Sequence, residues 1–195
     1  MHDSIREPWL VHGYRLFAKE GPTGLKIEVL SRQVGKNKSS FYHHFADLEV
    51  FIVLLLERHL KRAQEIAIEE RKCQNLDPEL IDVILDFKED LLFNRQLRVH
   101  RQRLEFEACC RRSNQIVGEA LAEVWAKSLG LTQEKPLSGQ LLQLVMENFY
   151  LQITEDKLNR SWLAQYFTGV QQTLGAYGKQ GANSSASFRM PEGGQ

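Results

Sequence analysis

Apolar residues recur every three or four positions along almost the whole chain, and no useful stretch alternates with the two-residue period of a β-strand. Leu10, Tyr14 and Phe17 define the buried face of a first helix at about 6–20. A segment rich in glycine and proline at 21–24 ends this helix. The pattern therefore predicts an all-α fold of about nine helices.

The remaining helices are bounded by capping residues and helix breakers. Asn37 and Asp47 are good N-cap residues, and Asp77-Pro78-Glu79 has the composition of a helix start. Further helices are expected at about 25–33, from Asn37 past Phe45, and at about 47–72, 77–93, 95–112, 114–129, 137–153 and 159–177. Residues 1–46 and 47–178 are predicted to form two domains, and the polar segment 179–195 a disordered tail.

Composition places the chain among ordinary globular proteins, with 195 residues, 43% apolar and 26% charged. Lys plus Arg and Asp plus Glu both number 25, which excludes a nucleic-acid binder identified by overall basicity. The charge is nevertheless uneven, because residues 1–46 contain seven Lys/Arg against four Asp/Glu, and residues 95–112 contain six against two. These two stretches are the candidates for anionic partners.

The cysteines and the longest apolar run indicate a cytoplasmic protein without a membrane span. Three cysteines give no disulfide framework and no metal-ligand spacing. Cys109-Cys110 fits either buried packing or a redox switch. The run Val50–Leu56 is far shorter than the roughly 20 residues of a membrane helix. The first residues have no apolar signal core, so no export is expected.

Residues 25–45 have the pattern of a helix, a glycine-containing turn and a second amphipathic helix, as a helix-turn-helix requires. Phe41 and Phe45 are predicted to be buried beneath the second helix. Its outward face carries hydrogen-bond donors that suit the DNA major groove, while nearby lysines suit phosphates. The candidate DNA-binding residues are Lys26, Lys36, Asn37, Lys38, Ser39, Ser40, Tyr42, His43 and His44.

These residues resemble the TetR family of bacterial transcriptional regulators. The resemblance spans about residues 5–58 and rests on Trp9-Leu10, Leu16-Phe17, Gly21, Leu30-Ser31, Gly35 and the tract Lys38-Ser39-Ser40-Phe41-Tyr42-His43-His44-Phe45. It implies that Tyr42 and Lys38 contact phosphate, that Ser39 and Ser40 approach bases or backbone, and that His44 contacts the backbone or supports the recognition helix. Two positions depart from the family pattern, which usually has an apolar residue at Lys36 and often a lysine at Leu48.

The last two predicted helices are apolar enough to cover a large surface. They either close the core of one chain or form a four-helix bundle with a second copy, and a palindromic operator favours the dimer. The candidate interface residues are Leu142, Met146, Phe149, Trp162, Tyr166, Phe167, Val170 and Leu174.

The middle helices are expected to enclose a ligand chamber. Leu97, Leu104 and Ala108 mark an inward stripe of the basic helix, and Arg101 falls on the same face. Arg101 or His100 could anchor an amphipathic or anionic ligand, or the arginines could simply pair with neighbouring glutamates. The candidate ligand residues are Phe87, His100, Arg101, Phe106, Trp125 and Phe149.

No nucleophile, acid–base or phosphate-loop motif points to an enzyme, and no metal site or cofactor is expected. The sequence favours a homodimeric, sequence-specific DNA-binding transcriptional regulator, a repressor that an unknown small molecule releases from a palindromic double-stranded operator. The alternative is a dimeric helical ligand-binding or adaptor module that no longer binds DNA.

Overall fold

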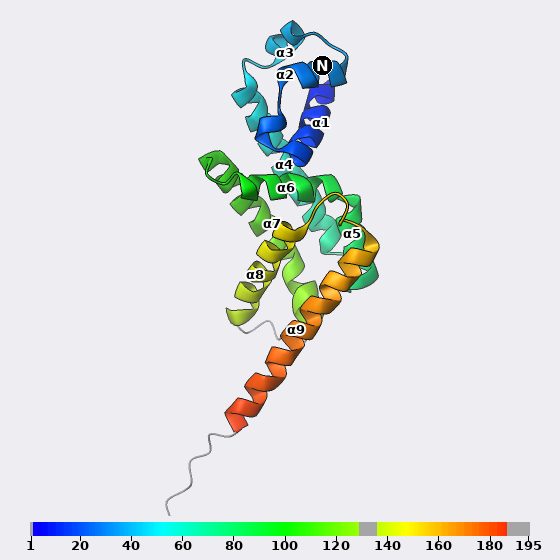
Figure 1. Cartoon of the computed structure of the whole chain (residues 1–195), viewed down its shortest axis with the longest axis vertical. Helices are drawn as coiled ribbons and strands as arrows, with labels where there is room; N and C mark the ends of the chain where they lie inside the picture. Colours follow the sequence, from blue (N-terminus) through cyan, green and yellow to red (C-terminus); the bar gives the residue numbers. More distant parts are fainter. Residues whose placement is uncertain (1, 129–135, 187–195) are drawn as a thin grey trace, which may run out of the picture.

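The computed structural model describes residues 2–128 and 136–186, which form nine α-helices, two short helical turns and no strand (Figure 1). The helices are α1 (His2–Glu20), α2 (Ile27–Val34), α3 (Lys38–His44), α4 (Leu48–Glu70), α5 (Ile81–Asp86), α6 (Lys88–Val99), α7 (Leu104–Ser128), α8 (Pro136–Gln152) and α9 (Arg160–Ala186). The short turns are η1 (Pro22–Gly24) and η2 (Leu76–Leu80). The prediction of an all-α fold is confirmed.

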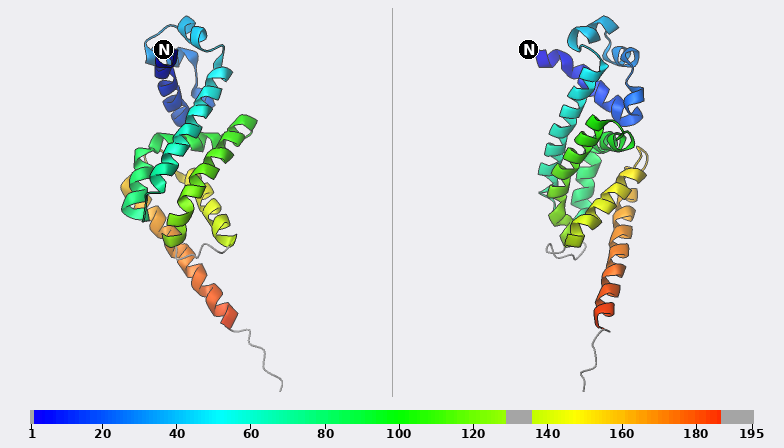
Figure 2. Two further views of the ribbon diagram at one scale, coloured as in Figure 1. Left: turned by 180° about the vertical axis from the view of Figure 1, so that it is seen from behind. Right: turned by 90° about the vertical axis from the view of Figure 1, so that its left-hand side faces the viewer.

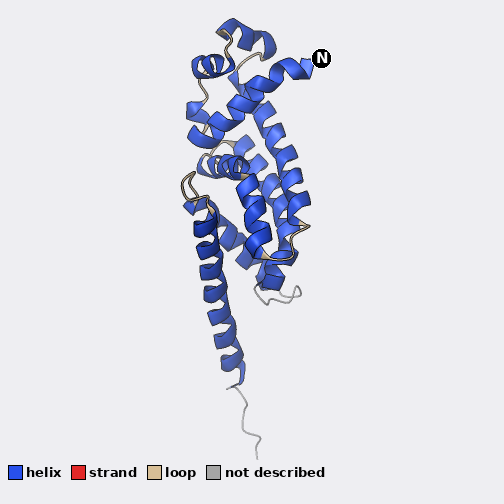
Figure 3. Ribbon diagram, turned by 90° about the vertical axis from the view of Figure 1, so that its right-hand side faces the viewer, coloured by secondary structure: helices blue, strands red, loops and turns tan. Residues whose placement is uncertain are grey.

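The molecule is elongated, with α1–α3 at one end and α4 running from that end into the other helices (Figure 1, Figure 2). Helix α4 packs along α7, and α1 packs on α6. At the opposite end, the C-terminal part of α9 projects beyond the other helices (Figure 1, Figure 3).

Several of the expected helix boundaries are wrong. The helix predicted at 77–93 is interrupted at Phe87, where α5 ends and α6 begins in a new direction, and the basic helix predicted at 95–112 is interrupted at 100–103. Both breaks follow from packing, because α6 must lay Phe93 and Leu97 into the core shared with α1. The tail predicted from residue 179 is instead helical as far as Ala186.

One hydrophobic core joins the N-terminal helices to the middle of the chain. Trp9 and Phe17 of α1 and Phe41 of α3 share it with Phe93 of α6 and Phe106 of α7, and all five are buried to 1% exposure or less. The core therefore crosses the boundary between residues 46 and 47 that the sequence predicts for two domains. A second core lies between α5, α7, α8 and α9 and includes Trp125, Phe149 and Phe167.

Among the described residues, no single helix is long and apolar enough to span a membrane. A bent pair, α3 followed by α4 at 65°, meets the criteria of length and composition.

A buried polar network ties α1, α4 and α6 together. The Tyr14 hydroxyl donates to Asp90 Oδ1 over 2.8 Å, and Arg62 holds the same carboxylate with Nε and Nη2 at 3.0 and 2.9 Å. Tyr14 also lies 2.7 Å from His59 Nδ1. The rings of Tyr14 and His59 both stack on Phe93, with centroids 4.2 and 4.7 Å away. Asp90 is thus buried with its charge compensated.

The hydrogen-bond partners of His59, the Tyr14 hydroxyl and the Asn94 amide, fit only a neutral imidazole ring. Since the only Tyr14 proton goes to Asp90, His59 Nδ1 donates to the Tyr14 oxygen. The other ring nitrogen, Nε2, faces the amide nitrogen of Asn94 at 3.4 Å and acts as an acceptor. Protonation would place an N–H against another donor. Burial accordingly lowers the pKa of His59 to about 4.

We expect His59 to make folding stability depend on pH. Unfolded His59 binds a proton below about pH 6.5, while the folded side chain stays neutral to about pH 4, so stability falls as the pH drops through this window. The loss is about 3 kcal/mol. Urea unfolding between pH 4 and 7 should show a shallower pH dependence for His59→Gln than for the native chain.

The control is His43→Gln, which changes an exposed histidine. This variant should keep the pH dependence of the native chain. If the free energy of unfolding depended on pH equally in His59→Gln and in the native chain, a neutral buried His59 would be contradicted.

Candidate functional site

The turn between α2 and α3 is built on Gly35. This residue adopts φ +69°, in the left-handed region that glycine enters most easily, and its N–H bonds to the carbonyls of Ser31 and Arg32. The Lys36 N–H then bonds to the Ser31 carbonyl over 2.9 Å. Asn37 begins α3 as an N-cap, with Oδ1 accepting from the Ser40 N–H at 2.8 Å. The predicted helix-turn-helix geometry is present.

Aromatic residues fix the orientation of α3. Phe41 and Phe45 point inward and meet Trp9 at centroid distances of 5.5 and 6.4 Å in edge-on contacts. Phe51 of α4 closes the cluster, 5.3 Å from Phe41 and 4.9 Å from Phe45. These rings leave the opposite side of α3 to the solvent, where Tyr42 is 55% exposed.

The candidate DNA-binding residues lie together at one end of the molecule, on α3 and the segments that precede it (Figure 1). Of the nine candidates, Tyr42 and six others are exposed. The six are Lys26, Lys36, Asn37, Lys38, Ser39 and His43. Ser40 and His44 are half-buried, and the His44 ring contacts those of His43 and Phe45. Leu48, at the start of α4, packs against the first core.

An acidic residue lies beside this surface. Glu28 of α2 forms an ion pair with Lys38, and both side chains are more than half exposed. The lysine lowers the pKa of the Glu28 carboxyl by a hydrogen bond and by its charge. An exposed pair of this kind contributes little stability and can exchange for a phosphate contact.

The six candidate ligand residues do not form one chamber. Trp125 and Phe149 belong to the second core, and Phe87 packs against a small cluster around Ala63. Phe106 belongs to the first core, next to α1. His100 lies beside Gly21 at the end of α1, where an added Cβ would meet its Nε2 at 2.9 Å.

The expectation that Arg101 points inward is wrong. Arg101 is exposed because it lies in the turn between α6 and α7 and not in a continuous helix. For the same reason Leu104 is 82% exposed and Ala108 is exposed, although Leu97 is buried. Arg103 pairs with Glu49 and Glu105, and not with Glu107.

The candidate interface residues divide into two groups. Phe149 and Phe167 are buried in the core of the single chain. Five are half-buried along α8 and α9, namely Leu142, Met146, Trp162, Tyr166 and Val170. Leu174 lies in α9, and its side chain is outside the described residues. Two exposed leucines of α8 escaped the prediction: Leu144 at 66% and Leu151 at 70%.

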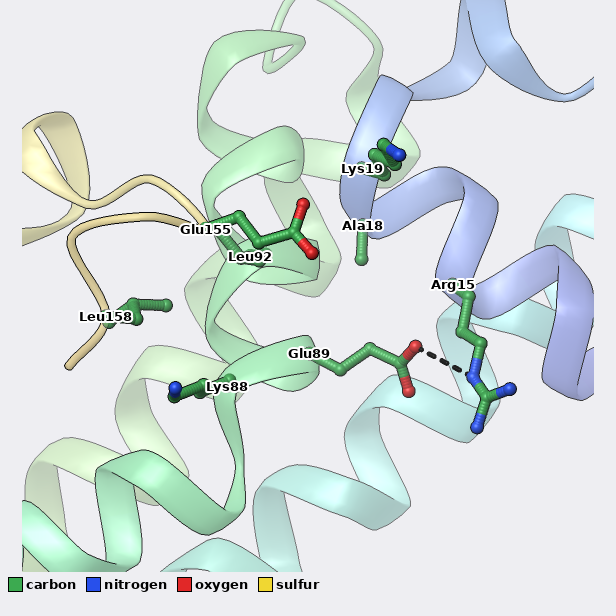
Figure 4. A pocket seen from close by; sticks show the side chains of 8 residues that line it. All are labelled: Arg15, Ala18, Lys19, Lys88, Glu89, Leu92, Glu155 and Leu158. Atoms are coloured by element: carbon green, nitrogen blue, oxygen red, sulfur yellow. Dashed lines mark ion pairs between the residues drawn. The ribbon is translucent and has the colours of Figure 1, made fainter.

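A cavity of about 270 Å³ lies where α1, α6 and the segment between α8 and α9 meet (Figure 4). Glu89 reaches across it to Arg15, with 3.2 Å between Oε1 and Nε, and burial raises the pKa of Glu89. Its lining is Arg15, Ala18, Lys19, Lys88, Glu89, Leu92, Glu155 and Leu158. This lining contains none of the six candidate ligand residues predicted from the sequence.

A smaller cavity of about 50 Å³ lies inside the second core and contains a residue that the sequence analysis missed, Glu70. Glu70 is 3% exposed, and its Oε2 atom has no hydrogen-bond partner. The signal was available in the sequence, since Ala63, Ile66, Ala67 and Glu70 follow the spacing of the buried face of α4. In the part of the chain that is described, no cluster of three or more His, Cys, Asp or Glu side chains could hold a metal ion.

The fold and this surface define an all-α protein with an N-terminal helix-turn-helix and a helical C-terminal region. A 58-residue segment, 30% of this chain, is 41% identical to the HTH-type transcriptional repressor NemR of Escherichia coli K12, and the same match is found in Escherichia coli O6:H1. The matched segment spans 29% of the length of these relatives.

A solved structure resembles most of the chain. A putative TetR-family transcriptional regulator from Mesorhizobium loti superimposes with a TM-score of 0.53 and 13% identity, over 91% of this chain and 96% of that one. No family model matches. The chain has the TetR-like fold, and both comparisons agree with the TetR resemblance carried by its sequence motifs.

We expect Gly35→Ala to lower the free energy of unfolding by about 1 kcal/mol. Its φ of +69° penalises a side chain, although no atom lies within 4 Å of the added Cβ. Urea unfolding at pH 7 measures the change. Gly118→Ala is the matched control because its Cβ also meets nothing within 4 Å, but the site is inside α7. It should stabilise the chain by about 0.5–1 kcal/mol, and a loss similar to that of Gly35→Ala would contradict the argument.

Proposed function

We propose that this chain is a sequence-specific DNA-binding transcriptional regulator, a homodimeric repressor that a small molecule releases from a palindromic operator. The observation that carries the proposal is the orientation of α3. Its inner face packs on Trp9 and Phe51, while Lys38, Ser39 and Tyr42 are exposed on the outside. This arrangement suits a helix entering a major groove about 12 Å wide.

Helix α4 supports a mechanism for release. Its first residues pack under α3, and its last residue, Glu70, lies in the second core. The helix has 23 residues, which corresponds to about 35 Å. A ligand that favours one position of its C-terminal end therefore displaces α1–α3, and two recognition helices roughly 34 Å apart lose their register on DNA.

The dimer in this proposal forms through α8 and α9. A groove of about 410 Å³ between them is lined by Val145, Asn148, Gln165, Tyr166, Gly169, Val170 and Thr173. Leu144 and Leu151 are seven residues apart and therefore share one face of α8. Exposed apolar side chains beside such a groove favour contact with a second copy. A regulator of chromosomal DNA acts in the cytoplasm, which is the location we propose.

The second candidate is a ligand-binding or adaptor module that does not bind DNA. The Lys38–Glu28 pair favours it, because one cation of the proposed DNA surface is already partly neutralised. The exposed Lys36 restores a positive charge at the turn. The two candidates differ in whether the chain binds duplex DNA at low salt.

We expect Tyr42→Ala to weaken DNA binding by about tenfold or more, since it removes the phosphate contact that we propose for this exposed side chain. Glu28→Gln should strengthen binding several-fold at low salt, because it removes a negative charge and frees Lys38 for phosphate. Fluorescence anisotropy on the DNA upstream of the coding sequence, titrated across salt concentrations, measures both changes.

Glu57→Gln is the control, since it removes another exposed carboxylate, from the middle of α4 and away from α3. It should leave the affinity unchanged. A scrambled duplex tests sequence preference. If neither the upstream DNA nor a genome-wide selection of bound fragments shows saturable binding, the chain is a ligand-binding or adaptor module and not a DNA-binding regulator.

We expect Leu151→Asp to convert the dimer into single chains of 22.5 kDa, because a charge at the centre of an apolar contact cannot be solvated. Sedimentation equilibrium at micromolar concentration measures the mass. Leu104→Asp provides the comparison, as it changes a leucine that is 82% exposed on α7 and should leave the dimer intact. Dimers that persist in Leu151→Asp would exclude this face of α8 from the interface.

A further inference from the structure

Glu70 differs from the charged residues of the other cavities. Arg15 pairs with Glu89 across the charged cavity, and Arg98 pairs with Glu147 beside an open cleft of about 480 Å³. No ion pair or hydrogen bond compensates Oε2 of Glu70, which is buried. An isolated buried carboxylate is costly, and natural cores rarely retain one without a partner or a function.

No positively charged side chain lines the Glu70 cavity, and Arg98, which lies 4.2 Å over the Tyr150 ring of the lining, pairs with Glu147. Besides Glu70, the lining residues are apolar or aromatic: Leu80, Ile84, Leu91, Val117, Leu121, Val145, Met146, Phe149, Tyr150, Tyr166 and Phe167. The Tyr166 hydroxyl is already used, since it donates to the Val145 carbonyl over 3.0 Å. Arg71, the residue that follows α4, is exposed, and its charge lowers the pKa of Glu70 less than burial raises it. Burial raises the pKa of the Glu70 carboxyl well above its usual range.

Two further features favour a cation in this position. Four of the twelve lining residues are aromatic, and the faces of aromatic rings attract cations. Glu70 is also the last residue of α4, where the carbonyl end of the helix carries a partial negative charge. The carboxylate, the aromatic rings and the C-terminal end of the helix each favour a positively charged group at this site.

The shape of the site indicates a head group with an apolar tail. A volume of about 50 Å³ is too small for a whole drug-sized ligand, which needs about 300–1,000 Å³. Met146 lines both this cavity and the open cleft of about 480 Å³, where Leu142 and Ala122 lie among polar and charged residues that include the Arg98–Glu147 pair. Because a methionine side chain changes rotamer easily, its movement can join the two spaces.

We propose that Glu70 anchors a lipophilic organic cation, with the ammonium head in the small cavity and the hydrocarbon body extending past Met146 into the cleft. Of the two ligands that the sequence suggests for the basic helix, amphipathic or anionic, this assignment departs from the anionic one. The role of the cation as effector rests on the proposed function. Its binding to Glu70 does not depend on that function. At the C-terminal end of α4, the site lies on the helix that leads to α3.

The test compares three molecules of one length: n-hexylammonium, 1-hexanol and hexanoate. Isothermal titration calorimetry on the full chain without DNA should show n-hexylammonium binding at least about tenfold more tightly than the other two. Glu70→Gln preserves the shape of the side chain and should remove this preference. Glu69→Gln is the matched control, because the neighbouring carboxylate is partly exposed and pairs with Lys72.

Equal binding of the three molecules, failure of the native chain to bind n-hexylammonium, or an unchanged preference in Glu70→Gln would each overturn the proposal. Urea unfolding of Glu70→Gln confirms that the variant is folded. The calorimetry uses no DNA, so a failure of operator binding leaves its result intact. Anisotropy of the DNA complex with and without n-hexylammonium then tests the regulatory role separately.

Discussion

The buried carboxylate of Asp90 fixes α1 and α4 relative to α6. It receives Tyr14 from α1 and Arg62 from α4, while its own helix, α6, supplies Phe93 as the platform on which Tyr14 and His59 stack. A buried charge is retained only where its partners are well placed, so small shifts of α1 or α4 are unfavourable. The position of α3 depends on this constraint, since α1 and α4 supply Trp9 and Phe51 beneath it.

The same helix, α4, passes through two contrasting electrostatic environments. Near its middle, Arg62 compensates Asp90, and the polar atoms around His59 are satisfied. At its C-terminal end, Glu70 is buried among apolar and aromatic side chains with an oxygen that lacks a partner. A fully paired junction is rigid, and a buried carboxyl group without a partner is a place where a ligand can change the energy of one arrangement relative to another. The two features together suit a helix that transmits binding at one end to the other.

Sequence reasoning succeeded where local rules are sufficient. The caps at Asn37 and Asp47, the turn at Gly35 and the burial of Phe41 and Phe45 each depend on a few neighbouring residues. It failed for Arg101, because periodicity assumed a continuous helix through 95–112. Glu70 was overlooked for another reason: a glutamate near a helix end is ordinarily exposed, and only the surrounding helices make it buried.

The sequence by itself determined the helical class, the helix-turn-helix and the side of α3 that faces the solvent, because the 3.6-residue period, capping and turn chemistry act over short distances. The tertiary structure decided where α6 breaks from its neighbours, how Asp90 finds Arg62 28 residues earlier in the chain, and which acidic side chain is enclosed without a partner. These outcomes depend on the packing of α1, α6, α8 and α9 against α4 and α7. The spacing of Glu70 along α4 indicates the buried face of that helix, but whether its carboxyl group finds a partner depends on the assembled helices around it.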